Sequence, residues 1–310
     1  MNFELTEEHL SVQQAARDFA QTELLPGVIE RDNKQEFPTE QIKKLGELGF
    51  LGMMVDPKYG GSGMDTVSYV LAMEELSKVD ASASVVVSVN NSLVCWGLEH
   101  YANEEQKQKY LVPMASGKCH GAFLLSEPEA GSDATSQSTT AIDMGDHYLL
   151  NGTKNWITNG NTATYYLVIA QTDVEKKHKG INAFIVEKAW AGVTVGGKEN
   201  KMGIRGSDTH SIMFQDVKVP KENRIGEDGN QIKHSGDSCI INPRGEVISK
   251  TMTHEDKSET LNLSYTYLQE FRKLFPVMMD GDEFEIHKRA GRVRLWREER
   301  QERRTTVGDH

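Results

Sequence analysis

The sequence contains few cysteines and lacks any long apolar run. Its three cysteines, Cys95, Cys119 and Cys239, show no CxxC or Cys/His spacing, which argues against a disulfide framework and predicts no metal site. A membrane-spanning helix needs about 20 consecutive, mainly apolar residues, and we find no such stretch. Residues 1–10 are acidic where a secretory signal would be basic and then apolar, so we expect a cytoplasmic protein with no membrane partner.

Positive charge is scarce except at the C-terminal end. Residues 287–310 contain eight Lys or Arg and four Asp or Glu, whereas the whole chain has a formal net charge of -11. Mixed Arg/Glu runs such as residues 296–304 are typical of a solvated helix or of disorder. We therefore expect a basic tail over 287–310 that is helical or disordered, and no nucleic-acid partner.

Helical periodicity prevails from Glu4 to about Lys118. Asp65 is placed to cap a helix, and Asn103 with Gln106 resembles a capping box that opens a helix reaching Met114. The apolar positions that predict the helical faces are Val12, Ala16, Phe19 and Ala20, then Ile42, Leu45 and Leu48, then Val67, Val70 and Leu71. This part is predicted to be an all-α domain.

After Gly117 the hydrophobic period changes to two, which predicts strands. The β-rich runs are residues 121–126, 147–150, 154–158, 165–171, 181–187 and 211–219. Turn residues separate several of them, at Gly145-Asp146, Asn151-Gly152 and Asn159-Gly160. The spacing predicts a compact antiparallel barrel as a second domain.

Two segments of this second domain carry polar and aromatic groups suited to a ligand. FLLSEPEAGSD, residues 123–133, is a strand that enters a loop rich in hydroxyls and backbone donors. NGTKNWITNG, residues 151–160, places Trp156 and Thr158 on the same face of a strand, because side chains alternate. A flat aromatic beside a hydroxyl suits an isoalloxazine ring. Taken singly, Trp156 would more often be a core aromatic and Ser132-Asp133 a turn or a helix cap.

Together these segments resemble the acyl-CoA dehydrogenase family, and most closely its short-chain, butyryl-type branch, over residues 2–227. DPKYGGSG at 56–63, KMGIRGS at 201–207 and VKVP at 217–220 support the resemblance. It implies an α+β multidomain fold: an N-terminal helical domain, a middle β-barrel and a C-terminal four-helix bundle, with FAD between barrel and bundle.

The resemblance also implies site residues. Ser132 would also reach the acyl-CoA, and Thr158 would hydrogen-bond near flavin N5. The residues implied to bind the cofactor are Phe123, Leu124, Leu125, Ser126, Gly131, Ser132, Trp156, Ile157 and Thr158.

The family's catalytic base is a Glu of the C-terminal bundle, which removes the proton α to the thioester while the flavin accepts a hydride. Beyond residue 230 the sequence departs from the bundle pattern, since residues 235–248 predict strand, tight turn and strand. We therefore expect that the bundle is missing and assign no catalytic residue. The remaining carboxylates are better read as solvated: Glu246, Glu255, Asp256, Glu259, Glu270 and Glu283.

The departing segment, residues 229–286, resembles the carboxyl end of the carbon–nitrogen hydrolases (nitrilase, omega-amidase). HSGDS at 234–238, NPRGE at 242–246 and LQEFRKLFPV at 268–277 carry this resemblance. The expected domains are therefore 1–118 (helical), 119–228 (barrel), 229–286 (a short hairpin, strand and helix segment) and 287–310 (basic tail).

The function implied is FAD-dependent dehydrogenation of a short-chain acyl-CoA to the trans-2-enoyl-CoA, in fatty acid or branched-chain amino acid degradation. An electron-transfer flavoprotein would accept the electrons, and the family is homo-oligomeric through its bundle, which leaves the oligomeric state of this chain open. One alternative is an inactive, chimeric flavoprotein remnant without the Glu base. A second is a fragment related to the carbon–nitrogen hydrolases.

Overall fold

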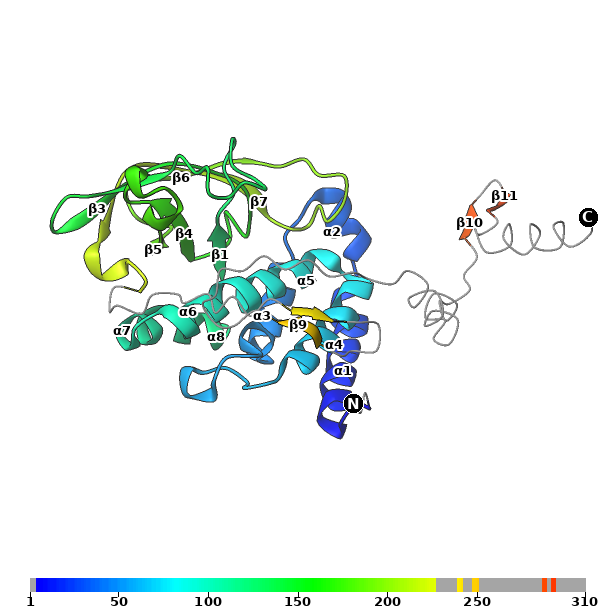
Figure 1. Cartoon of the computed structure of the whole chain (residues 1–310). Helices are drawn as coiled ribbons and strands as arrows, with labels where there is room; N and C mark the ends of the chain where they lie inside the picture. The colour runs from blue at the N-terminus through cyan, green and yellow to red at the C-terminus, as the bar shows by residue number, and fades with distance from the viewer. Residues whose placement is uncertain (1–3, 227–238, 242–246, 251–285, 289–290, 294–310) are drawn as a thin grey trace, which may run out of the picture. The chain divides into compact units, whose positions relative to one another are not determined.

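The computed structural model describes residues 4–226, 239–241, 247–250, 286–288 and 291–293 (Figure 1). The chain forms two compact units, Met1–Ile232 and Lys233–His310. The first unit contains a helical part followed by a β-sheet part, in the order predicted from the change of hydrophobic period.

The helical part confirms the predicted caps. Asp65 accepts a hydrogen bond from the Ser68 amide at the start of its helix, and Asn103 and Gln106 form a capping box. The α-, π- and 3₁₀-segments are α1 (Glu7–Phe19), η1 (Ala20–Leu24), α2 (Val28–Lys34), α3 (Thr39–Glu47), η2 (Phe50–Gly52), η3 (Pro57–Tyr59), α4 (Thr66–Val79), α5 (Ala81–Ser88), η4 (Val89–Cys95), α6 (Trp96–Tyr101), α7 (Glu104–Gln106), η5 (Lys107–Leu111) and α8 (Val112–Ala115).

The predicted apolar faces are only partly correct. All four positions predicted for α1 are buried, but Val67 and Val70 of α4 are exposed, as is Leu48, which follows the end of α3. The residues that α4 buries are Ser68, Ala72, Glu75 and Leu76. The carboxylate of Glu75 lies inward because Arg17 of α1 donates two hydrogen bonds to it, at 2.9 and 3.1 Å.

The sheet part is a mixed sheet of seven strands in the order β1-β4-β2-β3-β7-β6, with β5 paired to β4. The predicted second, all-β domain is confirmed. Its pairing is not antiparallel throughout, because β1 and β2 pair with β4 in parallel. Among the described residues, β6 has only β7 as a strand partner. The prediction also lacks β2 and β6. The strands are β1 (Gly121–Leu124), β2 (Thr140–Asp143), β3 (His147–Thr158), β4 (Tyr165–Gln171), β5 (Ile181–Glu187), β6 (Val193–Lys198) and β7 (Thr209–Pro220), and 3₁₀ turns η6 (Val174–Gly180) and η7 (Lys221–Asn223) follow β4 and β7.

The turn predicted at Asn151-Gly152 is also wrong, because both residues lie inside the single long strand β3. Gly152 has φ +145°, and a Cβ there would lie 2.4 Å from the Thr139 hydroxyl oxygen. The pairing of β3 with β7 shifts register between Leu150 and Gly152. Glycine is thus needed for a β-bulge and a close backbone approach, and not for a chain reversal.

Buried asparagines join the two parts of the first unit. The side chain of Asn90, in η4, accepts a hydrogen bond from the Gly121 amide at 2.9 Å and donates one to the Leu51 carbonyl at 2.7 Å. An apolar cluster spans the same junction and includes Val94 and Leu98 from the helices and Leu167 and Ile185 from the sheet. The first residue of β1 is therefore fixed against the helices.

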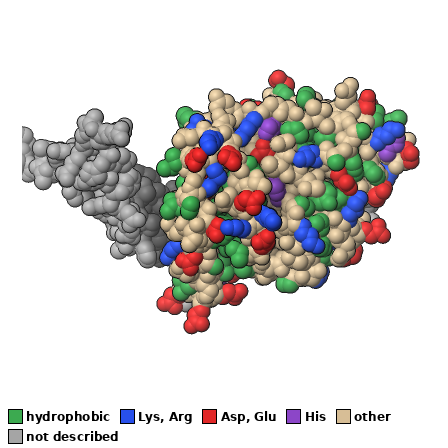
Figure 2. All heavy atoms as spheres, turned by 180° about the vertical axis from the view of Figure 1, so that it is seen from behind, with side chains coloured by type: hydrophobic (Ala, Val, Ile, Leu, Met, Phe, Trp, Pro, Cys, Tyr) green, Lys and Arg blue, Asp and Glu red, His purple; other side chains and the backbone are tan. Residues whose placement is uncertain are grey.

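The surface mixes charges of both signs. On the face shown in Figure 2, Lys and Arg side chains are interspersed with Asp and Glu. One helical stretch, Ala81–Tyr101, is long and apolar enough to cross a membrane by length and composition alone, although 56% of its most apolar window is buried inside the protein. Such burial is typical of a core helix.

The described residues of the second unit form two short antiparallel pairs. Strands β8 (Cys239–Ile241) and β9 (Val247–Lys250) pair with one another, in agreement with the strand, turn and strand predicted over 235–248. Strands β10 (Ile286–Lys288) and β11 (Gly291–Val293) also pair. They lie where a helical or disordered tail is predicted, so the beginning of the tail differs from that prediction. The helix expected within 229–286 and the carboxylates weighed there lie outside the described residues.

Candidate functional site

The two segments singled out in the sequence lie side by side in the structure. The Asn155 amide donates a hydrogen bond of 2.8 Å to the carbonyl oxygen of Ser126, which follows the end of β1. The loop after β1 and the last residues of β3 thus form one continuous edge. The predicted residues around Ser126 and Trp156 are thus brought together, from two strands that have no ladder pairing with each other.

A bulge near the end of β3 turns Trp156 outward. The register with β7 shifts between Lys154 and Ile157, and Trp156 has φ +57°. Trp156 is 59% exposed, whereas the following Ile157 is only 2% exposed and Thr158 is half-buried. The predicted shared face of Trp156 and Thr158 agrees with this burial pattern, and Trp156 is not a core aromatic.

The remaining predicted residues differ in what they can offer a ligand. The side chains of Leu124 and Ile157 are in the sheet core, so only their main chain could contact a bound molecule. Phe123, Leu125 and Ser126 are half-buried, and Gly131 and Ser132 are exposed. Among the described residues, the hydroxyls of Ser126, Ser132 and Thr158 have no hydrogen-bond partner.

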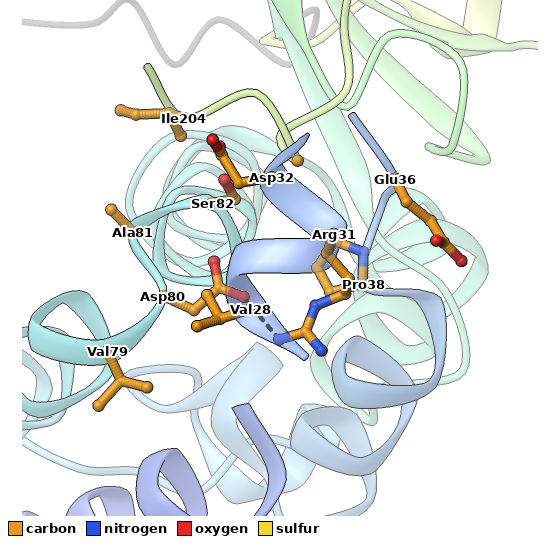
Figure 3. A pocket seen from close by; sticks show the side chains of 11 residues that line it. Val28, Arg31, Asp32, Glu36, Pro38, Val79, Asp80, Ala81, Ser82 and Ile204 are labelled. Carbon is orange, nitrogen blue, oxygen red and sulfur yellow. Dashed lines mark hydrogen bonds and ion pairs between the residues drawn. The ribbon is translucent and has the colours of Figure 1, made fainter. Parts of the chain in front are cut away.

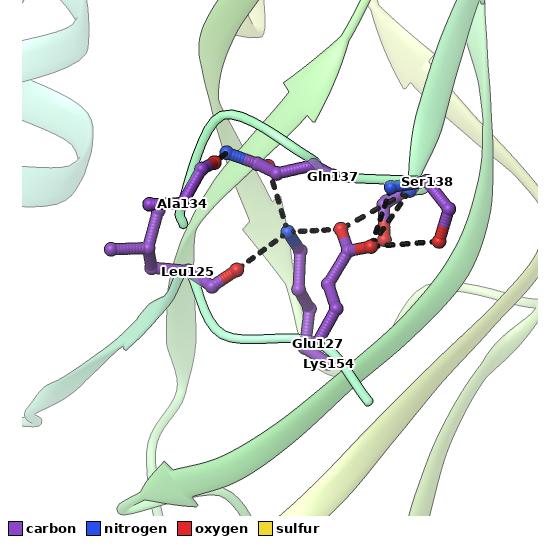
Figure 4. Close-up of polar contacts among 7 residues, drawn as sticks. Leu125, Glu127, Ala134, Gln137, Ser138 and Lys154 are labelled. Atoms are coloured by element: carbon purple, nitrogen blue, oxygen red, sulfur yellow. Dashed lines mark hydrogen bonds and ion pairs between the residues drawn. The ribbon is translucent and has the colours of Figure 1, made fainter. Parts of the chain in front are cut away.

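A buried ion pair lies directly behind this edge (Figure 4). The Lys154 ammonium, in β3, is 2.7 Å from a carboxylate oxygen of Glu127, and both side chains are almost wholly inaccessible. Burial alone would raise the pKa of Glu127, but hydrogen bonds from Lys154, Thr139 and Ser138 hold it at about 2. Burial lowers the pKa of Lys154 from its ordinary value, and Glu127 opposes that change.

The sequence prediction did not include this pair. One signal was available in the sequence. Lys154 shares the inward-facing side of β3 with Tyr148 and Leu150, and the loop after β1 contains two glutamates, residues 127 and 129. A charged residue at such a position is rarely buried without a partner of opposite charge.

A second anchor holds the chain just after Thr158. The Asp208 carboxylate accepts hydrogen bonds from the amides of Asn161 and Thr162 at 2.8 and 2.7 Å. Its other oxygen is 2.7 Å from His210 Nε2. The Asn159 side chain donates to the Gly121 carbonyl at 3.0 Å, so the turn is also fixed to the start of β1.

A hollow of about 190 Å³ is lined by none of the predicted cofactor residues (Figure 3). Charged side chains that line the hollow already form ion pairs: Arg31 pairs with Asp80 at 3.1 Å, and Asp32 pairs with Arg205 at 3.1 Å. Arg205 belongs to the KMGIRGS segment, whose loop is thereby joined to α2. The hollow therefore connects the helical and sheet parts and does not extend the candidate site.

Comparison with known proteins agrees with this geometry. Residues 6–118 match the acyl-CoA dehydrogenase N-terminal domain, and residues 122–217 match the acyl-CoA dehydrogenase middle domain. Residues 6–217 belong to the acyl-CoA dehydrogenase family. The predicted family and the order of its first two domains are thus confirmed.

Individual acyl-CoA dehydrogenases resemble the chain over the same region. The short-chain specific acyl-CoA dehydrogenase of Clostridium acetobutylicum is 46% identical over 229 residues, which are 74% of this chain and 60% of that protein. The butyryl-CoA dehydrogenase of Megasphaera elsdenii superposes with a TM-score of 0.72 at 46% identity, covering 73% of this chain and 60% of the other. A Bacillus anthracis acyl-CoA dehydrogenase complexed with FAD gives a TM-score of 0.67 at 38% identity, covering 72% and 38%.

The chain therefore spans about 60% of the length of the C. acetobutylicum relative. The matched region contains every residue predicted to bind the cofactor.

Proposed function

We propose that this protein is an FAD-dependent dehydrogenase of short-chain acyl-CoA thioesters, with a trans-2-enoyl-CoA as product. The observation that carries the proposal is exposed Trp156 beside the loop after β1, with the hydroxyls of Ser126, Ser132 and Thr158, which have no hydrogen-bond partner among the described residues. A flat aromatic surface with hydroxyls nearby suits a planar, polar ring. Several relatives that match this region are short-chain specific acyl-CoA dehydrogenases, and the matching structures include a complex with FAD.

The residues present fit the flavin in distinct roles. Trp156 would contact the ring, and Thr158 would donate a hydrogen bond to its edge. Ser126, with the main chain of Phe123, Leu124 and Leu125, would line the other side. Gly131 and Ser132 would also line the flavin, with Ser132 reaching the acyl-CoA as well, and Ile157 would contribute only its main chain. When bound, FAD supplies the acceptor for the hydride that leaves the β carbon of the substrate.

Removal of the α proton needs a carboxylate base, and we assign none to the described residues. Glu127 is the carboxylate nearest to the site in sequence, but it is buried, engaged by Lys154 and has a pKa of about 2. A group with so low a pKa accepts a proton poorly near neutral pH. Asp133 is exposed, and hydrogen bonds from Ser136 and Thr135 lower its pKa.

Several further expectations belong to the same proposal. An electron-transfer flavoprotein would reoxidise the flavin, as the family resemblance implies. We keep the cytoplasm as the proposed location. We keep 1–118, 119–228, 229–286 and 287–310 as the proposed domain boundaries. A carbon–nitrogen hydrolase origin of 229–286 rests on its sequence motifs alone, and it would bring no amidase site with it.

The proposal is tested by adding butyryl-CoA to the purified full chain loaded with FAD, without oxygen. We expect the visible flavin absorbance to fall as the flavin is reduced. A protein that holds FAD and is not bleached would contradict the dehydrogenase activity but leave flavin binding intact. A protein that takes up no FAD at all would overturn both.

A further inference from the structure

The Lys154–Glu127 pair contacts both arms of the loop after β1. Lys154 donates hydrogen bonds to the Leu125 carbonyl at 2.9 Å, to Glu127 at 2.7 Å and to the Gln137 side chain at 3.1 Å. Figure 4 shows the ammonium at the centre of these three acceptors. An ammonium has three protons, so its donor capacity is fully used.

The carboxylate of Glu127 completes the connection. It accepts hydrogen bonds from the Ser138 amide and hydroxyl at 2.6 and 2.8 Å, and from the Thr139 amide at 3.1 Å. Residues 125–127 and 137–139 are thus held together and against β3. The exposed stretch that contains Gly131 and Ser132 lies between these arms.

Stability alone does not account for such a pair. Lys154 and Glu127 are 0% and 1% exposed, and desolvating two charges costs several kcal/mol per ion, so apolar residues of similar size often serve a core equally well. What the pair provides is geometry, because each partner has several directed hydrogen bonds that an apolar pair could not make.

Lys154 of this pair lies on β3, next to the residues proposed to contact the flavin. Lys154 directly precedes Asn155, whose amide binds the Ser126 carbonyl, and Trp156 follows at the bulge. A shift of the loop relative to β3 would therefore change the spacing between the Trp156 ring and the hydroxyls of Ser126 and Ser132.

We propose that Lys154 and Glu127 are positioning residues for the flavin: they fix residues 125–139 against β3 so that Ser126, Ser132 and Trp156 face one ligand. This inference rests on the proposed FAD site. Neither residue touches the ligand, so both act through the backbone that they hold.

The test uses the full chain with three changes: Lys154→Met, the double change Lys154→Met with Glu127→Leu, and Asp80→Asn as the matched control. Asp80 belongs to another buried pair, with Arg31, in the helical part. Each protein is examined for its urea midpoint, for hydrogen exchange of residues 126–139 without FAD, and for its FAD dissociation constant. Hydrogen exchange and FAD binding are measured without urea, under conditions in which every variant is folded.

We expect Lys154→Met to speed exchange over 126–139 and to weaken FAD binding roughly tenfold, as loss of a supporting residue around a bound group commonly does. The double change removes both charges, so its urea midpoint should recover toward that of the native protein while exchange and FAD affinity do not. Asp80→Asn should leave exchange over 126–139 and FAD affinity unchanged.

Two outcomes would overturn the positioning role. One is exchange over 126–139 that stays at the native level in the double variant. The other is native FAD affinity in a double variant whose loop exchanges faster. If the unaltered chain binds no FAD, the proposed function is wrong, and so is the role of the pair in flavin binding. The hydrogen-exchange measurement still decides whether the pair holds the loop.

Discussion

At the residue scale, charge burial is the feature that most shapes this protein. Glu75, Asp80, Glu127, Lys154 and Asp208 are all buried, and each is engaged by directed hydrogen bonds or an ion pair. Such groups cost free energy when desolvated and are retained where partners are placed for them. They therefore mark the places where distant segments are held together.

The acid sensitivity of the α1–α4 contact follows from Glu75. Hydrogen bonding from Arg17 lowers the pKa of Glu75 from 4.5 to about 2 in the folded protein. A lowered folded-state pKa means that the ionised group stabilises the fold above about pH 4.5, and that this contribution is lost as the pH falls toward 2.

We expect Glu75→Gln to lower the urea midpoint near neutral pH, and the difference from the native protein to shrink at about pH 3. Glu74→Gln is the matched control, because the Glu74 carboxylate is exposed and pairs with Lys78. A midpoint difference for Glu75→Gln that is equally large at both pH values would contradict the assigned pKa.

At the element scale, the candidate site depends on β3, which contains Trp156 and Thr158. It continues through Asn151-Gly152 only because Gly152 adopts φ +145° and lets the strand approach Thr139. We expect Gly152→Ala to cost more than about 1 kcal/mol, since it combines a strained φ with a steric clash.

Gly131→Ala is the comparison for this change, because a Cβ at Gly131 meets nothing within 4 Å. Urea unfolding of both variants measures the difference. Equal unfolding free energies for the two would show that the bulge at Gly152 is not required.

The sequence allowed correct prediction where the cause is local. The caps at Asp65 and Asn103 depend on side chains within three residues, and both are present. These features were accessible because neighbours in the chain determine them.

Prediction failed where a distant partner determines the outcome. The inward face of α4 depends on Arg17, which lies on another helix. The role of Gly152 depends on Thr139, and the burial of Lys154 depends on Glu127. An Asn-Gly dipeptide commonly forms a turn, which is why a turn was predicted at Asn151-Gly152. The close approach of Gly152 to Thr139, which goes with a continuous strand, is not visible in that dipeptide.

At the scale of the whole molecule, the helical and sheet parts depend on one another at Asn90. We expect Asn90→Ala to lower the unfolding free energy by roughly 2–3 kcal/mol, because it leaves the Gly121 amide and the Leu51 carbonyl buried without this partner. Asn161→Ala, at an exposed position, is the control. A midpoint for Asn90→Ala within error of the control would contradict this coupling.

The central claim is that Trp156 and its neighbouring hydroxyls form the face that binds FAD. It is tested most directly by titrating the purified full chain with FAD and comparing Trp156→Ala with Trp96→Ala. Trp96 is also partly exposed, at 43% against 59% for Trp156, but it lies on α6 and stacks on His100. We predict that Trp156→Ala weakens FAD binding roughly tenfold or more, given about 1–3 kcal/mol for a lost aromatic stacking partner, while Trp96→Ala binds as the native chain does. Equal FAD affinity in Trp156→Ala and the native protein would contradict the claim.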